Sequence, residues 1–97
     1  MPKYNVLNEA ECRSHVLWSN HAIMRAVERE IDIRTLYHAW QVAKRYELPP
    51  GEIDYKVQKY GIRAMSDKFF FDELTGILFT IHVSKSGQWF IETVSIK

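Results

Sequence analysis

Cysteine is nearly absent from this sequence: Cys12 is the only one, so no disulfide can form within the chain. The sequence also lacks an apolar run long enough to cross a membrane, and no secretory leader is recognised at its N-terminus. A strong charge of either sign is missing too, because 13 Lys and Arg residues stand against 12 Asp and Glu residues and leave a net charge of +1. These absences predict a soluble protein of the reducing cytoplasm, with no membrane partner. They exclude a strongly basic nucleic-acid coat but allow a local basic patch.

Several common catalytic and binding motifs are absent as well. The chain has no glycine-rich phosphate loop, no Walker-type lysine motif and no calcium-loop pattern. Its histidines are scattered and, together with Cys12, show no zinc-ligand spacing; they are His15, His21, His38 and His82. We therefore predict neither a metal nor any other cofactor.

The chain does contain enough apolar material for a small core. Hydrophobic residues make up 46% of the 97 residues and aromatic residues 13%, while 26% are charged, as in an ordinary globular protein. The aromatic rings can supply much of this core, and Trp18, Trp40 and Trp89 are interpreted as core residues. A chain of this size predicts a single domain that spans residues 1–97.

The first half of the chain carries helical signals. Three helices are predicted over Leu7–Arg13, Ser19–Glu30 and Ile33–Tyr46. Asn8 and Asp32 are suited to cap the first and the third, because each can accept a hydrogen bond from a backbone N–H of the first turn. The short apolar segment Ser14–Trp18 fits either a strand or a helical continuation. The sequence Pro49-Pro50-Gly51 then predicts the end of the helical region.

The second half of the chain alternates between apolar and polar residues. Strand signals cover Ile53–Gln58, Ile77–Val83 and Trp89–Ile96, with three consecutive phenylalanines in Lys68–Asp72 and a further strand candidate at Ile62–Ser66. Gly76 and Gly87 lie in the turns between the last segments. The order of helices first and strands afterwards predicts an α+β fold, in which N-terminal helices pack on a four-stranded antiparallel sheet.

The predicted helix Ser19–Glu30 carries a row of polar residues that are candidates for a catalytic role. His21, Arg25 and Arg29 are spaced by four residues and therefore share one face of the helix. Another face of this helix carries apolar residues that are predicted to pack on the sheet. They are Ile23, Val27 and Ile31, with Ala22 and Ala26 beside them.

RNA cleavage without a metal needs a group that moves protons and groups that stabilise the charge of the phosphorane. A histidine can do the first and arginines the second. The alternative is that Arg25 and Arg29, with Glu28 and Glu30, form a solvated face of ion pairs on which His21 is an ordinary polar residue. The spacing alone favours this structural alternative.

A second basic group lies later in the chain. Lys56, Lys59 and Arg63 fall close together, followed by Lys68. Lysines along a solvated strand edge that prevent aggregation are one explanation. A groove that binds the phosphates of a nucleic acid is the other, and it makes Lys56, Lys59 and Arg63 candidate nucleic-acid-binding residues.

Three short motifs resemble the DUF4258 family of small bacterial and phage proteins. The first is Ser19-x-His21-Ala22-x-x-x-Ala26-x-x-Arg29-x-Ile31, the second is Phe71-Asp72-x-x-Thr75-Gly76-Ile77-Leu78-Phe79, and the third is Ile91-x-Thr93-Val94. This family resembles the barnase, colicin and RelE group of folds, in which helices precede a four-stranded antiparallel sheet. Many proteins of that group are toxins that cleave RNA without a metal.

The resemblance implies a metal-independent RNase toxin that acts on RNA and is neutralised by an antitoxin or immunity protein. His21 would then be the catalytic acid or base, Arg25 and Arg29 would bind phosphate, and Thr93 would project from the last strand toward the helix row. Ser95 stands where the family's closing motif has a tyrosine, so a hydroxyl that could assist catalysis is missing.

Two further interpretations stand beside the toxin. The loss of that tyrosine and the near-neutral charge favour a non-catalytic binding protein on the same fold, such as a phage-encoded inhibitor or a small nucleic-acid-binding protein. The other is a structural domain without chemistry of its own, for example one that forms a homodimer.

Overall fold

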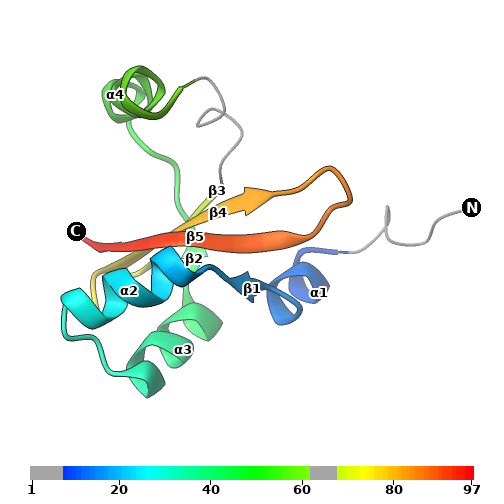
Figure 1. Cartoon of the computed structure of the whole chain (residues 1–97), viewed down its shortest axis with the longest axis vertical. Helices are drawn as coiled ribbons and strands as arrows, with labels where there is room; N and C mark the ends of the chain where they lie inside the picture. The colour runs from blue at the N-terminus through cyan, green and yellow to red at the C-terminus, as the bar shows by residue number, and fades with distance from the viewer. Residues whose placement is uncertain (1–7, 62–67) are drawn as a thin grey trace, which may run out of the picture.

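A computed structural model describes residues 8–61 and 68–97 of the chain (Figure 1). The elements, in chain order, are α1 (Glu9–Ser14), β1 (Leu17–Trp18), α2 (Asn20–Glu28), α3 (Ile33–Val42), β2 (Lys44–Arg45), α4 (Pro50–Tyr60), β3 (Lys68–Asp72), β4 (Ile77–Val83) and β5 (Trp89–Ile96). This arrangement confirms the predicted α+β class. No helix within the described ranges has both the length and the apolar character that a membrane crossing requires.

The sheet has five strands in the order β1-β5-β4-β3-β2. The predicted antiparallel arrangement is present in its centre, where β3 pairs with β4 and β4 with β5. The sheet as a whole is mixed, because β1 pairs with β5 in parallel and β2 pairs with β3 antiparallel. The sheet therefore has one strand more than predicted, and only the pairing of β1 with β5 departs from the predicted antiparallel arrangement. Strands of two residues, such as β1 and β2, are too short to leave an alternation that a sequence can reveal.

The prediction of a strand over Ile53–Gln58 was also wrong, because this segment lies in α4. Ile53 and Val57 are four residues apart, so they lie on one helical face, and both are half-buried. Pro50 suits the first turn of a helix, since its fixed φ is helical and its missing N–H has no partner there anyway. Gly61, with φ of 92°, ends the helix. The predicted strand candidate Ile62–Ser66 lies outside the described residues.

The main core fills the space between one face of the sheet and the helices α2 and α3. Its buried side chains are Ala22, Ala26, Leu36, Ala39, Trp40, Ala43, Phe70, Ile77, Phe79, Ile81, Trp89, Ile91 and Val94. The ring of Trp40 packs edge-on against Phe70 and Phe79, with centroids 5.3 and 5.2 Å apart. Trp40 and Trp89 are buried, and Trp18 packs against the cluster, which confirms the interpretation of the tryptophans as core residues.

The apolar face of α2 packs on the sheet as predicted, with the exception of Val27. Ala22 and Ala26 are 0% and 3% exposed, whereas Val27 is 71% exposed. Ile23 and Ile31 are partly buried and pack at the side of the core. Alanines allow the helix backbone to come close to β5, and a β-branched residue at the point of contact would hold it away. Val27 therefore points outward, and the prediction that it packs on the sheet was wrong.

The third helix is shorter than predicted. It ends at Val42, because Ala43 has an extended backbone with ψ of 143°, and Lys44 and Arg45 then pair with Phe71 and Phe70 of β3. The continuation of a helical pattern to Tyr46 was thus outweighed by the hydrogen bonds that a strand gains at the edge of the sheet.

A second, smaller core covers the opposite face of the sheet. Leu48, Phe69 and Leu78 are buried there, and Tyr46, Ile53 and Phe71 pack against them. Figure 1 shows α4 on this side and α2 with α3 on the other. The three phenylalanines of β3 thus serve both layers, because successive side chains of a strand point to opposite faces.

Ser19 joins α2 to the sheet. Its Oγ accepts a hydrogen bond from the Ala22 N–H at 3.0 Å and donates one to the Glu92 carbonyl at 2.9 Å. The Ser19 N–H donates to the Ile91 carbonyl at 3.1 Å. One side chain therefore caps the helix and attaches its first turn to β5.

We predict that Ser19→Ala lowers the free energy of unfolding by about 1–2 kcal/mol, since it removes the cap and the bond to β5. The measurement is urea unfolding followed by circular dichroism. Ser14→Ala is the matched control, because the Ser14 hydroxyl donates only to Glu11 within its own exposed helix. A loss no larger than that of the control would contradict the role given to Ser19.

Candidate functional site

The predicted catalytic row lies on the exposed side of α2. His21 and Arg29 are exposed, and Arg25 is half-buried. Arg25 Nη1 lies 3.9 Å from Glu28 Oε2, and both side chains are largely open to solvent. The ion pair that the structural alternative predicted is therefore present. The three side chains remain on one helix face, as their spacing requires.

Thr93 does not join this row. It pairs with Thr80, whereas the neighbouring pair Val94 and Phe79 lies in the core that α2 and α3 cover. Since adjacent residues point to opposite faces, Thr93 faces the side of the sheet that α4 covers. The prediction that Thr93 projects toward the helix row was wrong.

A β-bulge is the reason for this difference. The register shifts between Thr80 and Ile81, so that Thr80 pairs with Thr93 and Ile81 with Ile91, which leaves Glu92 as the extra residue. In a regular strand Ile91 and Thr93 would share a face, and Thr93 would point toward the helices with Ile91. The bulge turns the strand after Ile91 and sends Thr93 to the other side.

The predicted nucleic-acid-binding lysines lie on α4 among tyrosines. Lys59 Nζ is 5.6 Å from the ring centroid of Tyr55 and 5.4 Å from that of Tyr60. Lys56 Nζ is 5.8 Å from the centroid of Tyr60 and 5.7 Å from that of Phe69. Both tyrosines are well exposed, Tyr55 at 58% and Tyr60 at 63%. Arg63, the third predicted residue, lies outside the described residues. We call Tyr55, Lys56, Lys59 and Tyr60 the α4 surface.

The electrostatics of the α4 surface favour an anion. Hydrogen bonding to the hydroxyl of Tyr55, and then to that of Tyr60, raises the pKa of Lys59 above its ordinary value. The carboxylate of Glu52, at the start of the helix, lies 3.4 Å from Lys97 Nζ, which neutralises it. The Tyr46 hydroxyl, followed by Glu52, raises the pKa of Lys97, so this ion pair persists.

The row on α2 and the α4 surface do not form one site. Helix α2 packs on the face of the sheet that carries the main core, and α4 lies beyond the other face, as Figure 1 shows. The sheet separates His21, Arg25 and Arg29 from Lys56 and Lys59. A single RNA segment that spans both would have to pass around the edge of the molecule.

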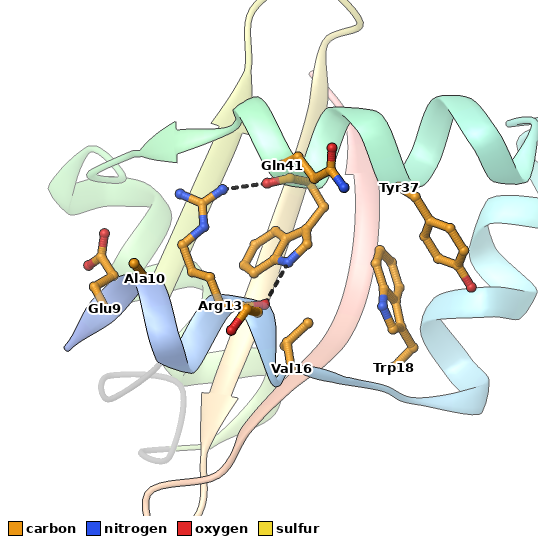
Figure 2. A pocket seen from close by; sticks show the side chains of 9 residues that line it. Glu9, Ala10, Arg13, Val16, Trp18, Tyr37 and Gln41 are labelled. Atoms are coloured by element: carbon orange, nitrogen blue, oxygen red, sulfur yellow. Dashed lines mark hydrogen bonds between the residues drawn. The ribbon is translucent and has the colours of Figure 1, made fainter. Parts of the chain in front are cut away.

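A pocket of about 690 Å³ lies between α1, β1 and α3 (Figure 2). Its lining residues are Glu9, Ala10, Arg13, Ser14, Val16, Trp18, Tyr37, Trp40 and Gln41. The signal for this pocket in the sequence was the spacing of two aromatic residues, Tyr37 and Trp40, three apart on α3, of which Trp40 was interpreted as a core residue. Arg13 was not singled out, because its partners are distant in the chain.

Arg13 holds the inner wall of this pocket. Its Nη1 donates to the Ala43 carbonyl at 2.7 Å and its Nη2 to the Trp40 carbonyl, so it satisfies the C-terminal end of α3. The guanidinium carbon lies 4.7 Å from the ring centroids of both Trp40 and Phe70. In return, Trp40 Nε1 donates to the Arg13 carbonyl at 3.2 Å. Burial lowers the pKa of Arg13, and the carboxylate of Glu9 opposes this shift.

We predict that Arg13→Ala lowers the free energy of unfolding by about 2–3 kcal/mol, because two carbonyls lose a charged donor. Arg13→Lys recovers only part of this, since one ammonium cannot reproduce the flat, two-pronged geometry of a guanidinium. Thermal and urea unfolding measure both effects. Arg34→Ala, which removes an exposed arginine from α3, is the control. If Arg13→Ala lowered the free energy of unfolding no more than this control, the stabilising role of Arg13 at the end of α3 would be refuted.

Comparison with protein-family models, with curated proteins and with solved structures found no match to this chain. The resemblance to the DUF4258 family therefore remains a prediction from short motifs.

Proposed function

We propose that this protein binds single-stranded RNA and that the α4 surface holds it. The observation that carries the proposal is the placement of the Lys59 ammonium close to the rings of two exposed tyrosines, Tyr55 and Tyr60. Proteins that bind single strands combine basic groups for the phosphates with aromatic rings on which the bases stack. Both tyrosine side chains are largely exposed and are therefore accessible to bases.

The chemistry of this surface suits an unpaired strand better than a duplex. Stacking on Tyr55 and Tyr60 requires bases whose flat faces are free, which only a single strand offers. Two lysines neutralise few phosphates, so we expect weak binding with a slope of log Kobs against log salt of about −1.4. The near-neutral net charge of the chain agrees with a local rather than a general affinity for RNA. The half-buried Cys12, with no partner for a disulfide in this chain, fits the reducing cytoplasm in which we place this activity.

A second candidate function is cleavage of RNA without a metal by His21, Arg25 and Arg29, which we call the α2 row. The protein would then be a toxin that a partner protein neutralises. The exposed histidine and two arginines on one helix face favour it. Thr93 takes no part in this version, because it faces the other side of the sheet. The row would therefore have to act with His21 as the proton-transfer group and Arg25 and Arg29 as the phosphate-binding groups.

For the α4 surface we predict that Tyr55→Ala weakens the binding of a fluorescently labelled single-stranded RNA about tenfold, because one stacking platform is lost. Fluorescence anisotropy at low salt is the measurement. Tyr55→Phe is the matched control: it keeps the ring and should bind close to wild type. Equal affinities of the alanine variant and the wild type would show that the RNA is not held on α4.

For the second candidate we predict that purified protein degrades total RNA in the presence of a chelator between about pH 5 and 8, and that His21→Ala reduces the rate about a hundredfold or more. His38→Ala, which removes an exposed histidine from α3, is the control and should cleave like wild type. Because α4 lies across the sheet, His21→Ala should still bind RNA with unchanged affinity. Absence of cleavage by the folded wild type would leave binding on α4 as the sole activity of the two.

A further inference from the structure

We infer that the pocket between α1, β1 and α3 binds a purine base that carries a phosphate. This site is independent of the proposed RNA binding on α4, because it opens on the opposite side of the sheet. Its volume of about 690 Å³ lies in the range of pockets that hold small organic ligands, and leaves room for a nucleotide.

Aromatic rings form the walls of the pocket. The ring centroids of Trp18 and Tyr37 lie 5.1 Å apart with their planes at 56°. Figure 2 shows these two residues side by side, with Val16 near them and Gln41 above on α3. Tyr37 is 45% exposed, although it lies against the core residue Trp18. A flat heterocycle that stacks on these rings would cover apolar surface that the fold leaves open.

Gln41 supplies a polar edge beside the rings. Within residues 8–61 and 68–97, its amide makes no hydrogen bond to another side chain or to the backbone. A carboxamide offers one acceptor and two donors, which is the pattern that pairs with the adjacent donor and acceptor of a purine such as adenine. The larger purine ring system also stacks over more area than a pyrimidine does.

The charge of the pocket suits a phosphate. Among the described lining residues Glu9 is the one carboxylate, and its Oε1 is bound by Arg45 Nη1 at 2.8 Å. Glu9 also acts on Arg13, but the positive charges of Arg13 and Arg45 together outweigh this one negative charge. The two bonds of Arg13 to carbonyls use only part of the donors of a guanidinium, so further N–H groups are left for an anion.

The indole N–H signals of the tryptophans in a nuclear magnetic resonance spectrum test this inference in the full-length protein. Trp18 and Trp40 line the pocket, whereas Trp89 does not and serves as the internal control. We expect titration with AMP to shift the first two signals and to leave the third in place. CMP should bind several-fold more weakly, because its single ring stacks over less area.

Gln41→Ala should weaken the binding of AMP about tenfold, since the paired contacts to the base edge are lost. Gln58→Ala, which removes an exposed glutamine from α4, is the matched control and should bind AMP like wild type. Both glutamines are exposed, and unfolding curves that superimpose on wild type establish that both variants fold. An unchanged affinity of Gln41→Ala would overturn the assignment of the base edge to this amide.

A short oligoadenylate distinguishes the two sources of the base. Shifts of Trp18 and Trp40 with AMP assign the pocket to a free nucleotide, and the same shifts with the oligoadenylate alone assign it to a base of an RNA chain. Both titrations are repeated on Tyr55→Ala, which removes one ring of the α4 surface. The shifts of Trp18 and Trp40 should persist in this variant, so the pocket is tested separately from RNA binding on α4. No shift with either probe, or an equal shift of Trp89, would overturn the inference.

Discussion

The burial of β4 on both of its faces is the constraint on which the rest of this structure depends. Five successive residues, Ile77 to Ile81, are buried, and among them only Thr80 is polar. A strand of this kind needs a layer on each side of the sheet. The helices α2 and α3 supply one layer, and α4 with the segment before it supplies the other. The two layers explain why the charged features of the chain end up on opposite sides.

This separation decides which functions the molecule can perform at one place. The α2 row and the α4 surface were both reasonable parts of an RNA site, yet the sheet lies between them. The proposed binding on α4 would therefore need no histidine, and the proposed cleavage on α2 would need no lysine from α4. The bulge at Glu92 adds to the separation, because it turns Thr93 away from α2. The geometry thus supports two small surfaces of different chemistry rather than one assembled catalytic centre.

Helix α1 stabilises the fold through contacts with residues that are distant in the chain. It buries none of its own residues, yet Arg13 spans the end of α3 and lies over two rings of the core. The stability gained there compensates for the cost of holding so short a helix in place. The same contact leaves an aromatic pocket between α1 and α3, with the charge of Arg13 at its wall. Under the proposed nucleotide binding, the same side chain would both support the fold and bind the phosphate.

The sequence by itself determined the features that depend on near neighbours. The α+β order, the caps at Asn8 and Asp32, and the strands Ile77–Val83 and Trp89–Ile96 follow from local periodicity and from side chains that reach their own backbone.

Only the tertiary structure decided the rest. Ile53 and Val57 fit the alternation of a strand and the spacing of a helix equally well, and the helix that forms packs Ile53 against Leu48, Phe69 and Leu78. The burial of alanines in place of Val27, the two-residue strands at the edges and the bulge at Glu92 depend on pairing with residues far away in the chain. A local sequence pattern does not predict such pairing, because the free energy of pairing depends on contacts between segments that are distant in the chain.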